Sequence, residues 1–289
     1  MYMSFGLTKK ALFSIVLVIL LIIGTTLTTT FGEKELSDNP YVEVPIIMYH
    51  GILKDKKYQG KYVISPKTFE KDLQYINDNG YTTIFMTDLI NYVYENAPLP
   101  EKPIIITFDD GYYNNYLYAF DLVKKYNWKM VLFPIGSCTD KFSESEDKNA
   151  NYSHCTWDNL NEMISSGHVE VQNHSYNLHS SSSSNLCSKK RKGESKEAYK
   201  KRFTEDLMKM QQKITDNTGF TPNTFTYPFG AKCEYSVELL KEMGFKASLD
   251  CEEKINKVSK QPDSLYCLHR FLRPPKTSSE EFFSKLKSD

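Results

Sequence analysis

The stretch from Pro103 to Gly111 constrains the fold of this chain more than any other. It reads Pro-Ile-Ile-Ile-Thr-Phe-Asp-Asp-Gly, so five apolar or β-branched residues run directly into two carboxylates and a glycine. A continuous apolar run of this length predicts a strand buried on both faces, as in a parallel sheet. Ligands of parallel sheets bind beyond the carboxyl ends of the strands, so Asp109 and Asp110 would lie where chemistry takes place. The alternative is a simple turn, because Asp-Gly is also a common turn pair.

Strands and helices alternate along the rest of the chain. Val44 to His50 predicts a first strand, and Ser65 is the expected N-cap of a helix that starts with proline. The whole chain contains about seven or eight predicted strands, separated by amphipathic helices and short loops. This alternation favours right-handed βαβ crossovers, and the number of strands favours a barrel over an open sheet. Thr139 to Ser153 reads as a polar insert, and the Cys251 to Asp263 stretch is expected to be irregular. A helix is expected over Tyr112 to Tyr126.

The charge balance excludes one broad class of function. The 289 residues contain 36 basic and 36 acidic side chains, so the formal net charge is zero. A dedicated nucleic-acid binder would usually carry a basic excess, so no nucleic-acid partner is expected. Residues 44–289 show no internal repeat and no second domain, and we expect a monomer.

The N-terminus has the pattern of an export signal. Lys9 and Lys10 precede an uncharged segment from Ala11 to Phe31, and residues 32–43 read as a polar linker. The uncharged segment is just long enough to cross a bilayer, and no clear Ala-x-Ala cleavage site follows it. We therefore expect residues 1–31 to be an uncleaved membrane anchor or a signal peptide, with the anchor slightly favoured. Either way the rest of the chain would lie outside the cytoplasm, anchored or secreted.

Export would make disulfides possible for the six cysteines, although the sequence selects no pairing. Several free, buried cysteines are an equally good interpretation.

Polar groups of one kind follow three of the predicted strands. His50 follows the first strand, Asp109 and Asp110 end the third, and His174 and His179 lie together after the fifth. Imidazoles with a carboxylate are the ligands of catalytic divalent metal sites that leave a position open for water. Zinc fits this set, and nickel, cobalt, iron and manganese also accept it. The alternative is two surface histidines beside a serine-rich loop.

These residues carry a resemblance to a known family. Thr107 to Gly111 resembles the first signature of the polysaccharide deacetylases, the NodB-homology domain of carbohydrate esterase family 4. His174-Ser175 with a second histidine at 179 resembles the second signature, in the spacing of the poly-N-acetylglucosamine deacetylase branch. Val44 to His50 resembles the opening motif of that branch, and Tyr227-Pro228-Phe229-Gly230 its third signature. The similarity covers roughly residues 44 to 287.

The resemblance implies a distorted (β/α)7-like barrel that carries one divalent metal ion, most simply Zn²⁺. Matched residue by residue, Asp110, His174 and His179 would be the metal ligands and Asp109 the catalytic base. The ion would polarise the amide carbonyl and acidify a bound water, because an N-acetyl amide is a poor electrophile. The expected reaction removes N-acetyl groups from an N-acetylglucosamine-containing cell-wall or extracellular polysaccharide, and it releases acetate.

The remaining family positions match less evenly. The backbone N–H of Phe229 would hold the oxyanion together with the metal, and Tyr227 and His50 are expected to contact substrate. Many members carry an arginine that braces the base, and Thr226 stands in its place. The late signature keeps only a histidine, so His269 is the candidate general acid for the departing amine.

Two other classes of protein remain open at this stage. One is a non-catalytic glycan-binding protein on a decayed deacetylase fold, which the weakened late motif favours. The other is a different metallohydrolase, such as a phosphoesterase, but the sequence shows neither a second metal cluster nor a phosphate-binding glycine-rich loop. The sequence does not choose between peptidoglycan and poly-N-acetylglucosamine as the substrate.

Overall fold

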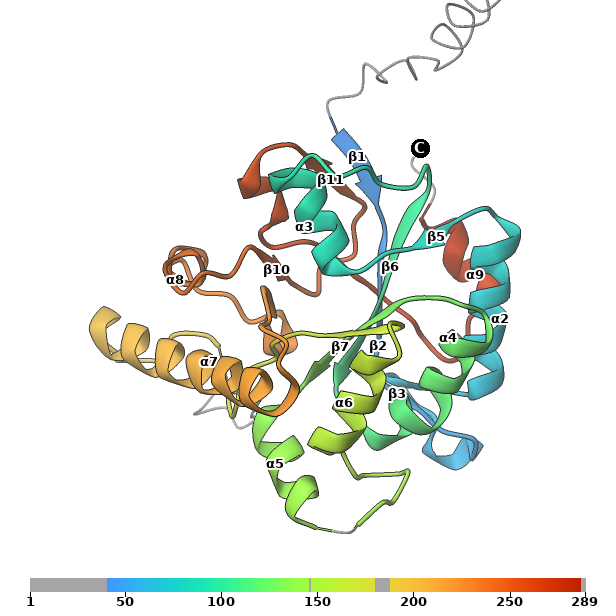
Figure 1. Ribbon diagram of the computed structural model, residues 1–289, viewed down its shortest axis with the longest axis horizontal. Helices are drawn as coiled ribbons and strands as arrows, with labels where there is room; N and C mark the ends of the chain where they lie inside the picture. Colours follow the sequence, from blue (N-terminus) through green and yellow to red (C-terminus); the bar gives the residue numbers. More distant parts are fainter. Residues whose placement is uncertain (1–40, 146, 180–187, 287–289) are drawn as a thin grey trace, which may run out of the picture. The chain divides into compact units, whose positions relative to one another are not determined.

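Parallel strands and surrounding helices make up the described part of the protein (Figure 1). The structure is a computed structural model that describes residues 41–145, 147–179 and 188–286. The strands are β1 (Tyr41–Val44), β2 (Ile46–Tyr49), β3 (Gly51–Ile52), β4 (Val63–Ile64), β5 (Thr82–Thr83), β6 (Pro103–Asp110), β7 (Met130–Pro134), β8 (Val169–Val171), β9 (Thr224–Thr226), β10 (Ala247–Leu249), β11 (Asn256–Ser259) and β12 (Phe271–Leu272). The α-helices are α2 (Pro66–Asp78), α3 (Met86–Tyr94), α4 (Asp121–Lys125), α5 (Gly136–Glu144), α6 (Trp157–Ser165), α7 (Lys196–Thr218), α8 (Ser236–Glu242) and α9 (Ser279–Ser284). Shorter turns of helix are η1 (Lys56–Tyr58), η2 (Asn115–Phe120), η3 (Pro228–Gly230) and η4 (Pro262–Leu265).

The parallel strand pairings run around a ring. Strands β12, β2, β6, β7 and β8 pair in that order, and every one of these pairs is parallel. Beyond β8, Asn173 bridges to Phe225 of β9, which pairs with β10. Leu249 at the end of β10 then bridges to Leu268, which lies just before β12. The stretch from Leu268 to Leu272 therefore closes the ring, as the predicted distorted barrel requires. The predicted α/β class is confirmed.

Strand β6 is the centre of this arrangement. All eight of its residues are buried, and it pairs with β2 on one side and β7 on the other. Its bounds match the sequence pattern, because a strand covered on both faces needs no polar alternation. The carboxylates of Asp109 and Asp110 end this strand inside the protein, although charged side chains are rarely buried without partners.

The helices that pack around the strands follow the sequence signals closely. Helix α2 begins after Ser65, whose Oγ accepts a hydrogen bond from the Thr68 N–H at 3.0 Å. Helix α7 buries one stripe of side chains at helical spacing and ends at Gly219, which adopts a left-handed conformation (φ 69°). The stripe consists of Tyr199, Phe203, Leu207, Met210 and Ile214.

Three predicted elements differ from the observed ones. The Thr139 to Ser153 insert is not wholly irregular, because helix α5 continues to Glu144. The Cys251 to Asp263 stretch contains β11, which pairs antiparallel with β1. The helix expected over Tyr112 to Tyr126 is present, but it contains a π-helical turn, η2, directly before α4. The first two segments are polar, and a tertiary partner rather than local periodicity orders them.

The predictions for the N-terminus and the cysteines concern described residues only in part. The predicted signal or anchor at residues 1–31 lies outside them, as does Cys187. Within the described ranges, none of the helices combines the length and the apolar character of a membrane span. The other five cysteines are free thiols, so the interpretation as free cysteines holds for them.

Candidate active site

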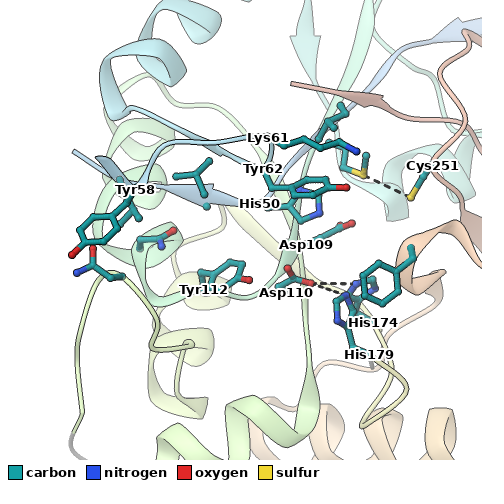
Figure 2. A pocket seen from close by; sticks show the side chains of 18 of the residues that line it. His50, Tyr58, Lys61, Tyr62, Asp109, Asp110, Tyr112, His174, His179 and Cys251 are labelled. Atoms are coloured by element: carbon teal, nitrogen blue, oxygen red, sulfur yellow. Dashed lines mark hydrogen bonds and ion pairs between the residues drawn. The ribbon is translucent and has the colours of Figure 1, made fainter. Parts of the chain in front are cut away.

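A pocket of about 780 Å³ opens at the carboxyl ends of the strands. Figure 2 shows Asp109 and Asp110 in its middle, His174 and His179 beside Asp110, and Tyr58 at the opposite side. The lining side chains come from the ends of β2, β6, β8 and β9 and from the loop between β3 and β4. The three strand ends that carried polar groups in the sequence therefore meet in one place, as parallel strands require.

Asp110, His174 and His179 form a compact cluster in this pocket. The Nε2 atoms of His174 and His179 lie 3.5 and 3.1 Å from Oδ1 of Asp110, and one ligand atom of each residue lies within 4.8 Å of the others. The Nδ1 of His174 lies 3.0 Å from the carbonyl oxygen of Thr226. This bond places the proton on Nδ1 and leaves the Nε2 lone pair directed at the cluster.

The cluster fits a divalent metal ion. Oδ1 of Asp110 is buried and finds no hydrogen-bond partner among the described residues, because neither imidazole contact has hydrogen-bond geometry. Burial raises the pKa of Asp110, but the two imidazoles outweigh it and hold that pKa well below its usual value. An ionised carboxylate facing two imidazole nitrogens is a ligand set for zinc and related ions.

The backbone at the end of β6 makes this geometry possible. Asp110 and Gly111 both adopt left-handed conformations, with φ of 69° and 71°. The Nδ1 of His154 lies 2.9 Å from the carbonyl oxygen of Asp110 and helps to hold the turn. A Cβ atom on Gly111 would lie 2.7 Å from the Cβ of Pro134, so only glycine fits there. The Asp-Gly turn and the placement of the Asp110 carboxylate in the cluster are thus the same structural feature.

Asp109 is held by a buried arginine from the other end of the chain. The guanidinium of Arg270 donates to both carboxylate oxygens, with Nη1 to Oδ1 at 2.6 Å and Nη2 to Oδ2 at 2.8 Å. Arg270 itself is fully buried and also donates from Nε to the carbonyl oxygen of Asp250 at 2.9 Å. Burial raises the pKa of Asp109, while Arg270, His174 and His50 together bring it below its usual value. Asp109 is therefore an ionised carboxylate fixed in orientation.

The loop between the two histidines is clamped by helix α7. Asp206 accepts hydrogen bonds from the backbone N–H groups of Tyr176 and Asn177, at 2.8 and 2.9 Å. The first turn of α5 adds two further bonds, from Gly136 to Ser175 and from Ser137 to the carbonyl oxygen of Tyr176. Helices α5 and α7 thus fix the separation of His174 and His179 without touching the cluster.

His50 and Phe229 line the pocket as predicted from sequence. Nδ1 of His50 is buried and has no hydrogen-bond partner among the described residues, so it is available to a ligand. Phe229 has a left-handed backbone (φ 56°), and its ring lies 4.4 Å from that of His179. The turn that follows β9 therefore brings residue 229 into the pocket.

Two other site predictions need correction. His269 is not among the described residues that line this pocket; its Nδ1 lies 3.0 Å from Asp250, and it lines a separate hollow. Tyr227 is fully buried, donates to Ser236 at 3.0 Å and packs edge-on against Phe225. Neither residue is among the described residues that line the pocket. A general acid at 269 and a substrate contact at 227 are therefore not supported.

Sequence reasoning missed Arg270 as part of the site. The chain lacks the arginine expected near the third signature, and Arg270, which directly precedes β12, is the arginine that binds Asp109. One signal was present: Arg270 directly precedes the apolar pair Phe271-Leu272 of β12. An arginine directly before a buried apolar pair is expected to need an acidic partner, which the sequence could have indicated.

Comparison with known proteins places the chain in a family. A family model described as polysaccharide deacetylase matches residues 96–248, more than half of the chain. The poly-beta-1,6-N-acetyl-D-glucosamine N-deacetylase of Escherichia coli strain K12 is 24% identical in an alignment of 238 residues, which covers 76% of this chain and 35% of that protein. The chain thus spans only about a third of the length of this relative.

Solved structures share the fold. IcaB from Ammonifex degensii gives a TM-score of 0.69 at 25% identity and covers 85% of this chain and 97% of its own. A Streptococcus pyogenes deacetylase, PplD, solved in complex with acetate, gives 0.69 at 20% identity, with coverage of 86% and 100%. The chain belongs to the polysaccharide deacetylase family. The Escherichia coli relative is named an N-deacetylase, which is the enzyme class expected from the sequence of this chain.

Proposed function

We propose that this protein removes N-acetyl groups from an N-acetylglucosamine-containing polysaccharide in a metal-dependent hydrolysis that releases acetate. The observation that carries the proposal is the arrangement of two adjacent carboxylates with separate partners. Asp110 faces His174 and His179, whereas Asp109 is bound by Arg270. One carboxylate is thus available to an ion and the other to a proton, which is the division that amide hydrolysis needs.

The metal site supplies the electrophilic part of this chemistry. Asp110, His174 and His179 would hold one divalent ion, most simply Zn²⁺ from the ligand types, which would polarise the amide carbonyl and lower the pKa of water. The second group of acids and histidine, around Asp250, already pairs with Lys232 at 2.5 Å. The ammonium of Lys232 therefore already supplies a positive charge beside Asp250, and we assign the metal ion to the cluster of Asp110, His174 and His179.

The protein's own groups would carry the proton transfers. Asp109 takes the proton from the attacking water, and Arg270 keeps its carboxylate ionised and oriented. Phe229 lines the pocket, and its backbone N–H would stabilise the oxyanion. His50, whose imidazole lines the pocket outside the metal cluster, would contact the substrate.

The substrate and the cellular location of the protein are also proposed here. The Escherichia coli relative is named for poly-β-1,6-N-acetylglucosamine, and we propose that this polymer or peptidoglycan is the substrate here. The lysines and the apolar run at residues 1–31 support a domain that acts as a monomer outside the cytoplasm, anchored to the membrane or secreted.

Metal removal and reloading test the function directly. Protein stripped with a chelator should release no acetate from oligomers of N-acetylglucosamine or from peptidoglycan, and one equivalent of Zn²⁺, Ni²⁺, Co²⁺, Fe²⁺ or Mn²⁺ should restore release. His179→Ala should lose the ion, whereas His168→Ala should keep it, because His168 instead contacts the carbonyl oxygen of Trp128. Acetate release that resists the chelator would contradict metal dependence. Stoichiometric metal without any acetate release would favour the non-catalytic glycan-binding alternative.

The Asp206 clamp leads to a separate prediction. Asp206→Ala should weaken metal binding by about 10- to 100-fold, because groups that orient ligands typically contribute that much. Both backbone donors of the histidine loop lose their acceptor in this variant. The measurement is a competition titration with a chromogenic chelator. Asp216→Ala, on the exposed side of the same helix, is the matched control. Equal affinities in the two variants would show that the loop holds its shape without Asp206.

A further inference from the structure

The pocket extends well beyond the two carboxylates. Its volume of about 780 Å³ is in the upper part of the range of about 300–1,000 Å³ found for pockets that hold drug-sized ligands, and a single acetamido sugar is smaller than those. Figure 2 shows the metal cluster and Tyr58 at opposite sides of the pocket, with Tyr62 and Tyr112 between them. The reaction itself needs only the part near Asp109 and Asp110, so the rest of the pocket is unexplained by the chemistry.

The unexplained part is lined by exposed aromatic rings. Among the described residues, six large apolar side chains are exposed, and three of them line this one pocket. These three are Tyr58 at 45%, Tyr62 at 45% and Phe229 at 51% exposure. Large exposed rings gathered at one pocket indicate a ligand surface, whereas single exposed apolar residues need no explanation.

The element that carries Tyr58 has no core function. Helix η1 buries none of its residues, so Tyr58 does not serve to pack it. The loop is nevertheless fixed by two hydrogen bonds. The backbone N–H of Gly51 donates to the carbonyl oxygen of Tyr62 at 3.0 Å, and the side-chain amide of Gln59 donates to the carbonyl oxygen of Leu53 at 3.0 Å. Both rings are therefore presented to solvent on a preorganised support, which lowers the entropy lost on binding.

The two rings share a second feature. The ammonium of Lys57 lies 4.7 Å from the centre of the Tyr58 ring, and that of Lys61 lies 5.0 Å from the centre of the Tyr62 ring. Each ring therefore has a cation on one face, which helps to hold it in place. Tyr62 also contacts the ring of His50 at 4.8 Å, so its subsite would adjoin the reacting centre.

We propose that Tyr58 and Tyr62 form stacking subsites for sugar units that flank the acetylated unit. Pyranose rings present an apolar C–H face, which packs on an aromatic face. The protein would thus bind a stretch of polymer, with Tyr62 next to the reacting unit and Tyr58 further along the chain. This inference rests on the proposed deacetylase function and adds to it a requirement for chain length.

The test compares substrates of increasing length. For the metal-loaded full-length protein, kcat/KM for acetate release should rise from the single sugar to longer β-linked N-acetylglucosamine oligomers. In Tyr58→Ala this rise should be reduced, with a loss of about tenfold on the longest oligomers and a smaller loss on the shortest. Tyr62→Ala should already lose activity on shorter oligomers than Tyr58→Ala does, because Tyr62 lies nearer the reacting sugar unit. Tyr58→Phe should keep the wild-type profile, because it keeps the ring.

Tyr94→Ala is the matched control, since Tyr94 is an exposed tyrosine on helix α3 that lines a different hollow. Alanine variants with the wild-type dependence on length would overturn the subsites, and so would losses equal at every length. If the wild-type protein releases acetate neither from any oligomer nor from peptidoglycan, the proposed function fails. Equilibrium binding of the same intact oligomers then decides the subsites: weaker binding by the alanine variants supports them, and equal binding overturns them.

Discussion

Asp109→Asn should reduce kcat for acetate release by about 10²- to 10⁴-fold, the usual contribution of a general base. The amide of asparagine has nearly the shape of the carboxylate but cannot accept the proton of the attacking water. The bound metal should remain, because Asp110, His174 and His179 form the cluster without Asp109. The measurement pairs acetate release with metal content on the same sample.

Two comparisons make this result specific. Asp121→Asn changes an exposed aspartate on helix α4 and should leave both quantities unchanged. Asp110→Asn should lose metal and activity together, because Asp110 belongs to the cluster. Full activity in Asp109→Asn would reject Asp109 as the base. Loss of metal in that variant would instead assign Asp109 to the ion.

Arg270→Met should lower both the free energy of unfolding and the activity. Removing one partner of a fully buried ion pair typically costs about 3–5 kcal/mol, because the remaining charge is left without compensation. Denaturant unfolding measures this loss. Because Arg270 is also what orients Asp109, kcat should fall at pH values where the variant is still folded.

The pH dependence separates orientation from folding. Asp109 must be ionised to accept a proton, so activity is present above its pKa and is lost as the pH falls through that value. Burial raises the pKa of Asp109, and Arg270 is the strongest of the groups that lower it. Without Arg270 the pKa rises, so the acid limb of the kcat/KM profile should move to higher pH. An unmoved limb would show that Arg270 serves stability alone.

The same pair sets the stability of the wild-type protein in acid. The pKa of Asp109 is lower in the folded protein than its ordinary value, so ionised Asp109 contributes stability above the unfolded pKa. That contribution is lost as the pH falls through the folded pKa. The double variant Asp109→Leu/Arg270→Met should recover much of the stability lost in the single variant while staying inactive. Recovery of activity in the double variant would contradict both assigned roles.

The parts of the site that the sequence predicted are those set by local pattern. Strand β6 ends in Asp109 and Asp110 as expected, since a buried strand followed by Asp-Gly leaves few alternatives. His174 and His179 follow β8 directly, and parallel strands bring their carboxyl ends together. Periodicity also predicted α7, because its buried stripe repeats at helical spacing.

The parts that were missed depend on contacts between distant segments. Arg270 meets Asp109 across 161 residues, and no local signal specifies that pairing. His269 and Tyr227 were placed in the site from their motifs, but the direction of each side chain depends on how its segment joins the ring. Successive side chains of a strand point to opposite faces, so a shift of one residue decides whether a side chain faces the pocket or the opposite side.

The closure of the ring has a consequence for the nascent chain. The cluster of Asp110, His174 and His179 draws only on residues up to 179, whereas Arg270 is synthesised after all three of them. The stretch from Leu268 to Leu272 both completes the ring and delivers that arginine. A chain that stops short of it could assemble its three metal ligands yet would leave the base without its brace. The segment that closes the ring is thus also the segment that completes the support of the base.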